Sequence, residues 1–249
     1  MHISITSEPL FHIGSFTVTN TLFTSWIVIL GLIVLAFFIK RAIKPVPGKF
    51  QALIEIIFEK LTEFLQVFAG DKETVKKFFP LVGTIFIFIL ASNWVGTLPG
   101  VETIGLHEEH DGEEVFIPLL RTVNSDLNVT LALALILVVT THVAGFMTIG
   151  PKHHLGKFFV NPFKKPIGFF VGFLEIIGEI SKIVSLTFRL FGNIFAGSVL
   201  MLIISFLAPF VIPIPFIGLE LFVGFIQALV FSVLAMMFLS SSVRYHEEH

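Results

Sequence analysis

A single arginine stands inside a long apolar stretch, and this feature constrains the fold more than any other. The chain carries no charged side chain from Leu190 to Ala208 and no proline over 167–208. A continuous helix of about 40 residues would be roughly 60 Å long, about twice the thickness of a bilayer's hydrocarbon core. Placing an arginine at membrane depth costs at least about 2.5–3.5 kcal/mol, so Arg189 indicates an ion path or a buried counter-charge.

The composition predicts an all-α polytopic membrane protein. The chain has 249 residues, of which 55% are hydrophobic, and its mean hydropathy of +0.93 is too high for an ordinary soluble domain. A formal net charge of −2 offers no basic surface for nucleic acid. The absence of cysteine excludes disulfides and thiolate metal sites. We therefore expect a single integral membrane domain over 1–249, with membrane lipid around it.

Five apolar segments are long enough to be membrane-embedded helices, at about 22–39, 78–98, 127–149, 167–208 and 216–243. Basic residues such as Lys40 and Arg41 follow the first segment, and others follow the third. The positive-inside rule then predicts an N-terminus outside and a cytoplasmic C-terminus. Between the first two segments, about 49–68 has the pattern of an amphipathic interfacial helix. Residues 99–124 are predicted to form an external acidic loop.

The histidines do not predict a cofactor. His107 and His110 lie among acids in the predicted loop, and a solvated acidic loop is favoured over a metal site because nothing fixes ligand geometry. His142 lies within the third segment. A haem-binding bundle normally offers paired histidines on facing helices, and no other apolar segment contains one. We expect neither a metal nor an organic cofactor.

The polar residues of the longest segment fall on one stripe when it is drawn as a helix. They lie within roughly 80° of one another, and they are Glu175, Glu179, Lys182, Arg189 and Asn193. Arg189 and Asn193 are four residues apart and so are neighbours on one face. A buried ion pair that fixes helix packing is one interpretation. A stripe of five polar residues favours an ion path instead.

The sequence Arg189-Leu190-Phe191-Gly192-Asn193, followed by Ala196-Gly197, resembles the signature of subunit a of the F-type rotary ATP synthase. The wider resemblance begins near Pro47-Gly48 and runs to the C-terminus. It implies a membrane stator whose last two helices form a long tilted hairpin beside a ring of c subunits. It also implies peripheral-stalk b subunits as partners, protons rather than sodium as the transported ion, and a bacterial inner (plasma) membrane rather than an organelle membrane.

The resemblance further implies two offset half-channels separated by Arg189. Arginine keeps its proton and so cannot relay one, but it can attract an ionised carboxylate on the c ring. The remaining roles follow from matching positions: Asn193 and Gln227 as polar partners of Arg189, Glu220 on the external path, and Glu175 on the internal side. Glu179 is an additional acid on the internal side, and neutralising Lys182, three residues on, is the alternative role for it. The family often places a second ionisable residue where this chain has Ser198. Asp126 and Asn128 are the candidates to replace it.

Two other classes stay open from the residues alone. A self-contained ion channel or secondary transporter would use the same charges, but it should show internal repeats or broken helices. An integral membrane enzyme would need a nucleophile–base pair or a spacing such as His-Glu-x-x-His, and the apolar segments contain neither. No Gly-x-x-x-x-Gly-Lys loop occurs. We therefore expect a non-enzymatic, non-nucleotide-binding subunit, with ATP chemistry on other subunits of its complex.

Overall fold

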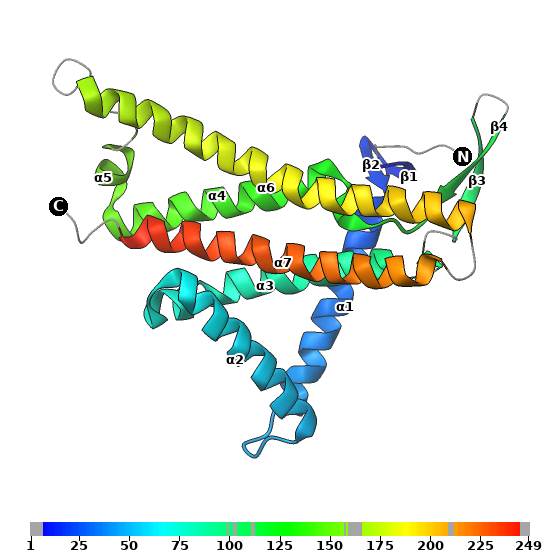
Figure 1. Cartoon of the computed structure of the whole chain (residues 1–249), viewed down its shortest axis with the longest axis horizontal. Coiled ribbons are helices and arrows are strands. Elements are labelled where there is room, and N and C mark those ends of the chain that lie inside the picture. The colour runs from blue at the N-terminus through cyan, green and yellow to red at the C-terminus, as the bar shows by residue number, and fades with distance from the viewer. Residues whose placement is uncertain are drawn as a thin grey trace.

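The computed structural model describes residues 7–98, 100–101, 104–110, 113–156, 158, 166–208 and 212–244. It is a bundle of long helices with small β-hairpins at one end (Figure 1). Within these described residues, five helices are long and apolar enough to cross a membrane: α1 (Asn20–Ala42), α3 (Lys72–Thr97), α4 (Leu127–Ile149), α6 (Pro166–Leu207) and α7 (Pro213–Arg244). The predicted class, an all-α polytopic membrane protein with a long final hairpin of helices, is confirmed.

The two ends of the bundle differ in structure. One end, which we call the hairpin end, carries β1 (Pro9–Ile13) paired with β2 (Phe16–Thr19), and β3 (Gly105–His110) paired with β4 (Glu113–Pro118), both antiparallel (Figure 1). The acidic segment at 99–124 therefore contains a β-hairpin, and the side chains of His107 and His110 lie outside the described residues. The opposite end, which we call the α5 end, carries α5 (Pro151–Gly156).

Local capping explains where the helices begin and end. Asp71 accepts a hydrogen bond from the backbone N–H of Thr74 at 2.7 Å, so α3 begins at Lys72, ahead of its apolar part. Gly70 ends α2 (Lys49–Ala69) with a φ of +80°, a conformation that glycine adopts without strain. Pro213 lies at the first position of α7, where its missing N–H costs nothing.

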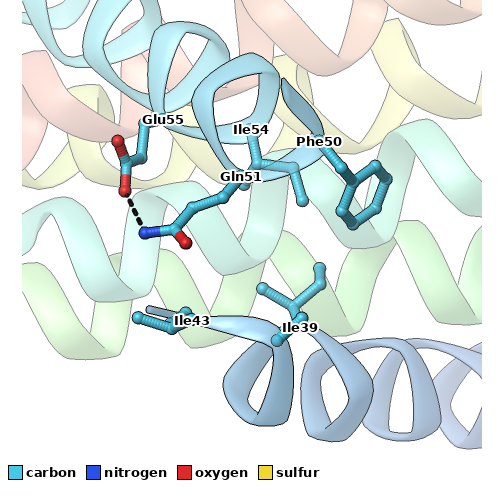
Figure 2. A pocket seen from close by; sticks show the side chains of 7 residues that line it. Ile39, Ile43, Phe50, Gln51, Ile54 and Glu55 are labelled. Carbon is cyan, nitrogen blue, oxygen red and sulfur yellow. Dashed lines mark hydrogen bonds between the residues drawn. The ribbon is translucent and has the colours of Figure 1, made fainter. Parts of the chain in front are cut away.

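The corner between α1 and α2 is held by Gln51. Its side chain accepts a hydrogen bond from the Lys44 N–H at 3.0 Å and donates to the Lys44 carbonyl at 3.1 Å and to Glu55 at 2.8 Å. Figure 2 shows this amide beside a small apolar pocket of about 70 Å³, lined by side chains that include Ile39, Ile43, Phe50 and Ile54. Ligand pockets usually exceed about 300 Å³, so this corner is a structural joint.

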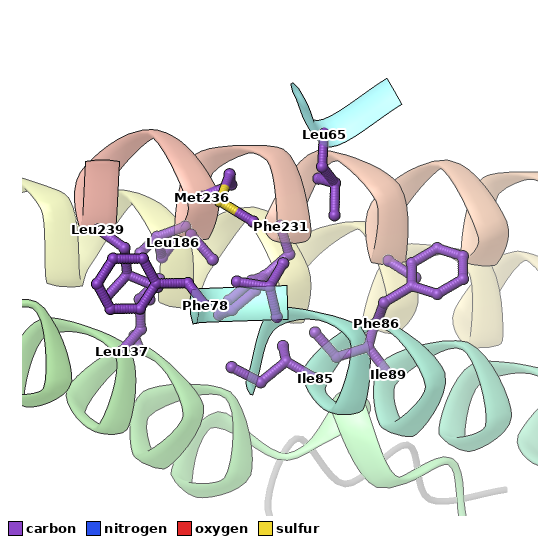
Figure 3. Packing of buried hydrophobic residues seen from close by; sticks show 14 of the residues in the cluster. Leu65, Phe78, Ile85, Phe86, Ile89, Leu137, Leu186, Phe231, Met236 and Leu239 are labelled. Carbon is purple, nitrogen blue, oxygen red and sulfur yellow. The ribbon is translucent and has the colours of Figure 1, made fainter. Parts of the chain in front are cut away.

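The core of the bundle forms around α7, which packs against α2, α3, α4 and α6. Figure 3 shows its side chains converging between these helices, among them Leu65, Phe78, Ile89, Leu137, Leu186, Phe231, Met236 and Leu239. Lipid tails are as apolar as these side chains, so a membrane supplies no hydrophobic drive for helix association. Close packing and interhelical hydrogen bonds must specify the arrangement instead.

Asn93 provides such hydrogen bonds between α3 and α7. Its amide nitrogen donates to the Gly224 carbonyl at 3.1 Å, and its amide oxygen accepts from the Asn124 side chain at 2.7 Å. The indole of Trp94 donates to the Leu221 carbonyl at 3.1 Å. Gly224 allows this approach because a Cβ added there would lie 3.0 Å from the Cβ of Asn93.

We predict that Gly224→Leu destabilises the bundle and that Gly218→Leu, on the same helix, does so far less. A side chain at Gly224 must push α7 away from Asn93, whereas a Cβ at Gly218 would meet no atom within 4 Å. Overpacking of this kind costs about 1–3 kcal/mol. Thermal melting of the detergent-purified protein measures the difference. Equal melting temperatures of the two variants would contradict the proposed role of this contact.

Candidate functional site

The stripe that carries Arg189 lies along an open side of α6. Leu186, Leu190 and Ile194 are buried against the bundle, whereas Arg189 and Asn193 are exposed. In the apolar part of this helix only 11% of the residues are buried, the lowest share of the five long helices. Exposed apolar side chains flank the stripe, including Val184, Phe188, Leu200 and Ile203. α6 therefore presents a long apolar face with one guanidinium in it.

Arg189 has a neutral partner from its own helix. Its Nη2 atom donates a hydrogen bond to the Ser185 hydroxyl at 3.3 Å. The sequence predicts Asn193 as a neighbour of Arg189 on the same face, and both side chains are exposed. Helical side chains point toward the helix N-terminus, so the guanidinium reaches back to Ser185, four residues earlier. Among the described residues, no carboxylate lies within 4.0 Å of the guanidinium. The positive charge of Arg189 is thus left without an acid from the described part of the chain.

Glu179 is paired elsewhere. Its Oε1 atom lies 2.8 Å from the ammonium of Lys182, and its Oε2 atom lies 3.7 Å from Nε2 of His142 on α4. Glu179 precedes Arg189 by ten residues, which is about 15 Å along a helix. Glu175 is half-buried one turn nearer the α5 end. The two acids of α6 therefore belong to the stretch between Arg189 and the α5 end.

Glu220 lies on α7 near the hairpin end and contacts α6. A Cβ added at Gly197 would lie 3.2 Å from the Glu220 Oε1 atom, so this glycine makes room for the carboxylate. The neighbouring Ser198 donates its hydroxyl hydrogen to the Ile194 carbonyl at 3.1 Å. Gln227 is half-buried two turns further along α7. The structure thus brings Glu220 against Gly197, the residue next to Ser198, where the sequence lacks a second ionisable residue.

Asp126 is buried and fixes the start of α4. One carboxylate oxygen accepts a hydrogen bond from the Thr21 hydroxyl of α1 at 2.7 Å. The other accepts from the backbone N–H of Asn128 at 2.8 Å, so Asp126 is the N-cap residue. The Asn128 side chain itself is exposed. Asp126 therefore has a structural task in addition to the path role expected from the sequence.

The structure adds His154, which sequence patterns did not connect to His142. Nε2 of His154 lies 3.0 Å from Nδ1 of His142. Gly150, with a φ of +88°, reverses the chain after α4, and α5 then carries His154 back onto that helix. The Gly150-Pro151 pair is a helix stop and restart signal that could have suggested this return. In the described part of the chain, no group of three or more acidic or histidine side chains is arranged to hold a metal ion.

Comparisons with known proteins identify similar chains. The family described as ATP synthase A chain matches residues 22–240. ATP synthase subunit a of Geobacter sp. (strain M21) is 35% identical over 224 residues, covering 89% of this chain and 86% of the relative. The Trichlorobacter lovleyi subunit a is 34% identical over 244 residues, covering 97% and 94%. The Gloeobacter violaceus subunit a is 35% identical over 230 residues, covering 92% and 86%.

We predict that Asp126→Ala destabilises the protein by about 1–2 kcal/mol, the cost of losing a helix N-cap. Asp126→Asn keeps an acceptor for the Asn128 N–H and a polar partner for Thr21, so it should melt close to the parent protein. Thermal melting in detergent measures both variants. A loss of stability of the same size in both would show that the negative charge, rather than the cap, holds this corner.

Proposed function

The chain belongs to the ATP synthase A chain family, and on this premise we propose that it is the stator subunit of the ATP synthase proton channel. It is a membrane subunit that is not itself catalytic. In this proposal it forms two offset half-channels and, together with a carboxylate of the c ring, couples proton flow to rotor rotation and so to ATP synthesis or hydrolysis. The whole chain forms one integral membrane domain.

The observation that carries the proposal is the position of Arg189. Its guanidinium is exposed on an apolar face and has only the Ser185 hydroxyl as a hydrogen-bonding partner among the described residues. A cation at membrane depth is stabilised by an opposite charge. The carboxylate of a c subunit, arriving at this face, supplies that charge. Arg189 favours its ionised form and thereby makes it release its proton before it passes.

The two half-channels follow from the distribution of polar side chains. Glu220 lies toward the hairpin end, with Asp126 and Asn128 at the same end. Glu175 and Glu179 lie between Arg189 and the α5 end. Asn193 and Gln227 provide polar groups near the arginine. Carboxylates and amides pass protons through water to the ring from each side, and Arg189 prevents a direct leak between the two paths.

The orientation and partners follow from the same reasoning. We place the α5 end in the cytoplasm and the N-terminus outside a bacterial inner membrane, because basic residues follow the first and third spans. The compared relatives named above are bacterial proteins. The apolar part of α1 is only 17% buried, which leaves its surface to lipid and to peripheral-stalk b subunits. Protons are preferred over sodium because protons are the commoner ion in the family.

A self-contained channel is the rival that the experiments must exclude. A stator of this design needs the c ring to carry ions past Arg189, so the chain alone, reconstituted in liposomes, should conduct few protons. A channel or secondary transporter would conduct without the ring. Measurement of proton flux with and without c subunits therefore separates the two functions.

We predict that Arg189→Ala abolishes ATP-driven acidification of inverted vesicles and raises their passive proton leak. Removing the fixed cation lets a c-ring carboxylate pass in its protonated form and opens a route between the half-channels. Ser185→Ala is the matched control, because it removes only the 3.3 Å hydrogen bond at an exposed site. It should pump at close to the parent rate. Coupled pumping retained by Arg189→Ala would overturn the proposed function.

We predict that Glu220→Gln slows ATP-driven pumping by at least about tenfold. A glutamine amide cannot take up and release a proton as a carboxyl group does. The loss of pumping rate should be close to or below the smallest effect of a general acid–base group, because water in the path carries part of the proton flow. Glu63→Gln, an exposed acid of α2, is the control and should leave the rate unchanged. Initial rates of vesicle acidification measure both. An unchanged rate in Glu220→Gln would remove this residue from the path.

A further inference from the structure

His142, His154 and Glu179 form a cluster whose two histidines have no role in the function proposed above. We propose that His142 is a proton-relay residue of the inner half-channel and that His154 is the positioning residue that orients it. The inference rests on the proposed function, because it needs a proton path from the c ring to the α5 end. It adds to that path two histidines from α4 and α5.

The three side chains are arranged in sequence. Nδ1 of His142 lies 3.0 Å from Nε2 of His154, and Nε2 of His142 lies 3.7 Å from Oε2 of Glu179. The His142 ring thus uses one nitrogen toward α5 and the other toward α6. The second oxygen of Glu179 is held by Lys182 at 2.8 Å, so the carboxylate divides its oxygens between a permanent cation and a titratable ring.

His154 is held firmly enough to set the orientation of His142. Its side chain is 1% exposed and packs edge-to-face on Phe146 at 4.7 Å and near Phe158 at 6.0 Å between ring centroids. Gly145 makes space for the ring, because a Cβ there would lie 2.5 Å from the His154 Nδ1 atom. A buried imidazole in such a cage keeps one rotamer. Its Nε2 atom is therefore a fixed partner for His142.

Either ring nitrogen of this contact can be the donor, and one of the two arrangements gives a useful tautomer of His142. When Nδ1–H of His142 donates to Nε2 of His154, the Nε2 lone pair of neutral His142 faces Glu179. Protonation at that nitrogen creates an imidazolium whose two N–H groups meet His154 on one side and the Glu179 carboxylate on the other. Both the neutral and the charged forms of His142 are thus stabilised without movement of the ring.

The relay conserves protons at each step. A Glu179 carboxylate takes up a proton that the c ring has released and that water has carried to it, transfers this proton to Nε2 of His142 and becomes a carboxylate again. The imidazolium then releases that proton from Nε2 to water and returns to the neutral form. The His142 side chain is 27% exposed and that of Glu179 is 15% exposed, so the histidine is the less covered of the two within the chain. Proton uptake during ATP hydrolysis runs in reverse.

The test compares variants in vesicles stripped of the catalytic sector, with proton flux through the membrane sector driven by a potassium diffusion potential. His142→Asn keeps a polar atom near His154 but removes the nitrogen that takes up a proton, and it should lower the flux about tenfold. His154→Gln keeps a polar atom where Nε2 was, whereas His154→Leu does not. We expect near-parent flux from His154→Gln and a several-fold loss from His154→Leu. His153→Asn, an exposed neighbour, is the matched control.

A pH profile separates a relay from a structural role. Within the described part of the chain, the titratable and charged groups that face His142 are Glu179 and Lys182 of α6 and His154 of α5. Among these residue types, histidine is the one that commonly changes its charge between about pH 5 and 8. Parent flux should change across this pH region, and His142→Asn should be slower and flatter there. If His142→Asn assembles poorly with the c ring, the same profile is measured with His142→Gln.

The outcomes are distinguishable. Parent-like flux and pH profile in His142→Asn, together with loss of coupled pumping in Arg189→Ala, would overturn the relay and leave the stator function standing. Coupled pumping that survives Arg189→Ala would remove the premise of both. A low flux in His142→Asn with an unchanged pH profile would also overturn the relay, because it would assign a purely structural role to the ring. A slow, flat profile in His142→Asn, with parent-like His153→Asn, supports it.

Discussion

The main constraint on this structure is Arg189, a cation that α6 carries at membrane depth. A guanidinium in this setting demands an opposite charge, yet Glu179, an acid of the same helix, is held by Lys182 and faces His142. The only described hydrogen bond of Arg189 goes to the Ser185 hydroxyl, within the same helix. An unpaired cation on an open apolar face is a cost to the isolated chain. The cost becomes an advantage when a moving partner brings a carboxyl group to this face. The guanidinium then favours the ionised form of that carboxyl group, which releases its proton.

The rest of the bundle keeps this face open. Buried side chains such as Leu186 and Leu190 pack one side of α6 onto α4 and α7, and the polar stripe is left at the edge of the packed side. Asn93 binds α3 to α7, and Asp126 binds α1 to α4. Because lipid gives helices no hydrophobic reason to associate, these buried polar contacts and the close approaches at glycine determine which surfaces are covered. Gly197 likewise allows a close approach between α6 and α7, because its missing side chain leaves space for the Glu220 carboxylate.

The lengths of the apolar segments were sufficient to predict five spans and the class of the protein, because membrane thickness fixes helix length. The placement of charges was sufficient to single out the arginine on its stripe, because the cost of burying a charge restricts where an arginine can occur. Contacts between distant segments could not be predicted in this way. The pairing of His142 with His154 depends on the chain reversal at Gly150, and the pairing of Asp126 with Thr21 joins helices far apart in sequence. Periodicity within one helix places Asn193 on the same face as Arg189, but it did not identify Ser185 as the acceptor of the guanidinium's hydrogen bond.

The most direct test asks whether a rotor subunit contacts the Arg189 face. The chain has no cysteine, so Asn193→Cys introduces a single thiol one turn from Arg189, and Ile194→Cys places one on the packed side as a control. Each is combined with a cysteine beside the carboxylate of the c subunit, and disulfide formation is followed under mild oxidation. A cross-link from position 193 and not from 194 is the predicted result. A cross-link from 194 alone, or from neither position in an assembled complex, would contradict a carboxylate partner at this face.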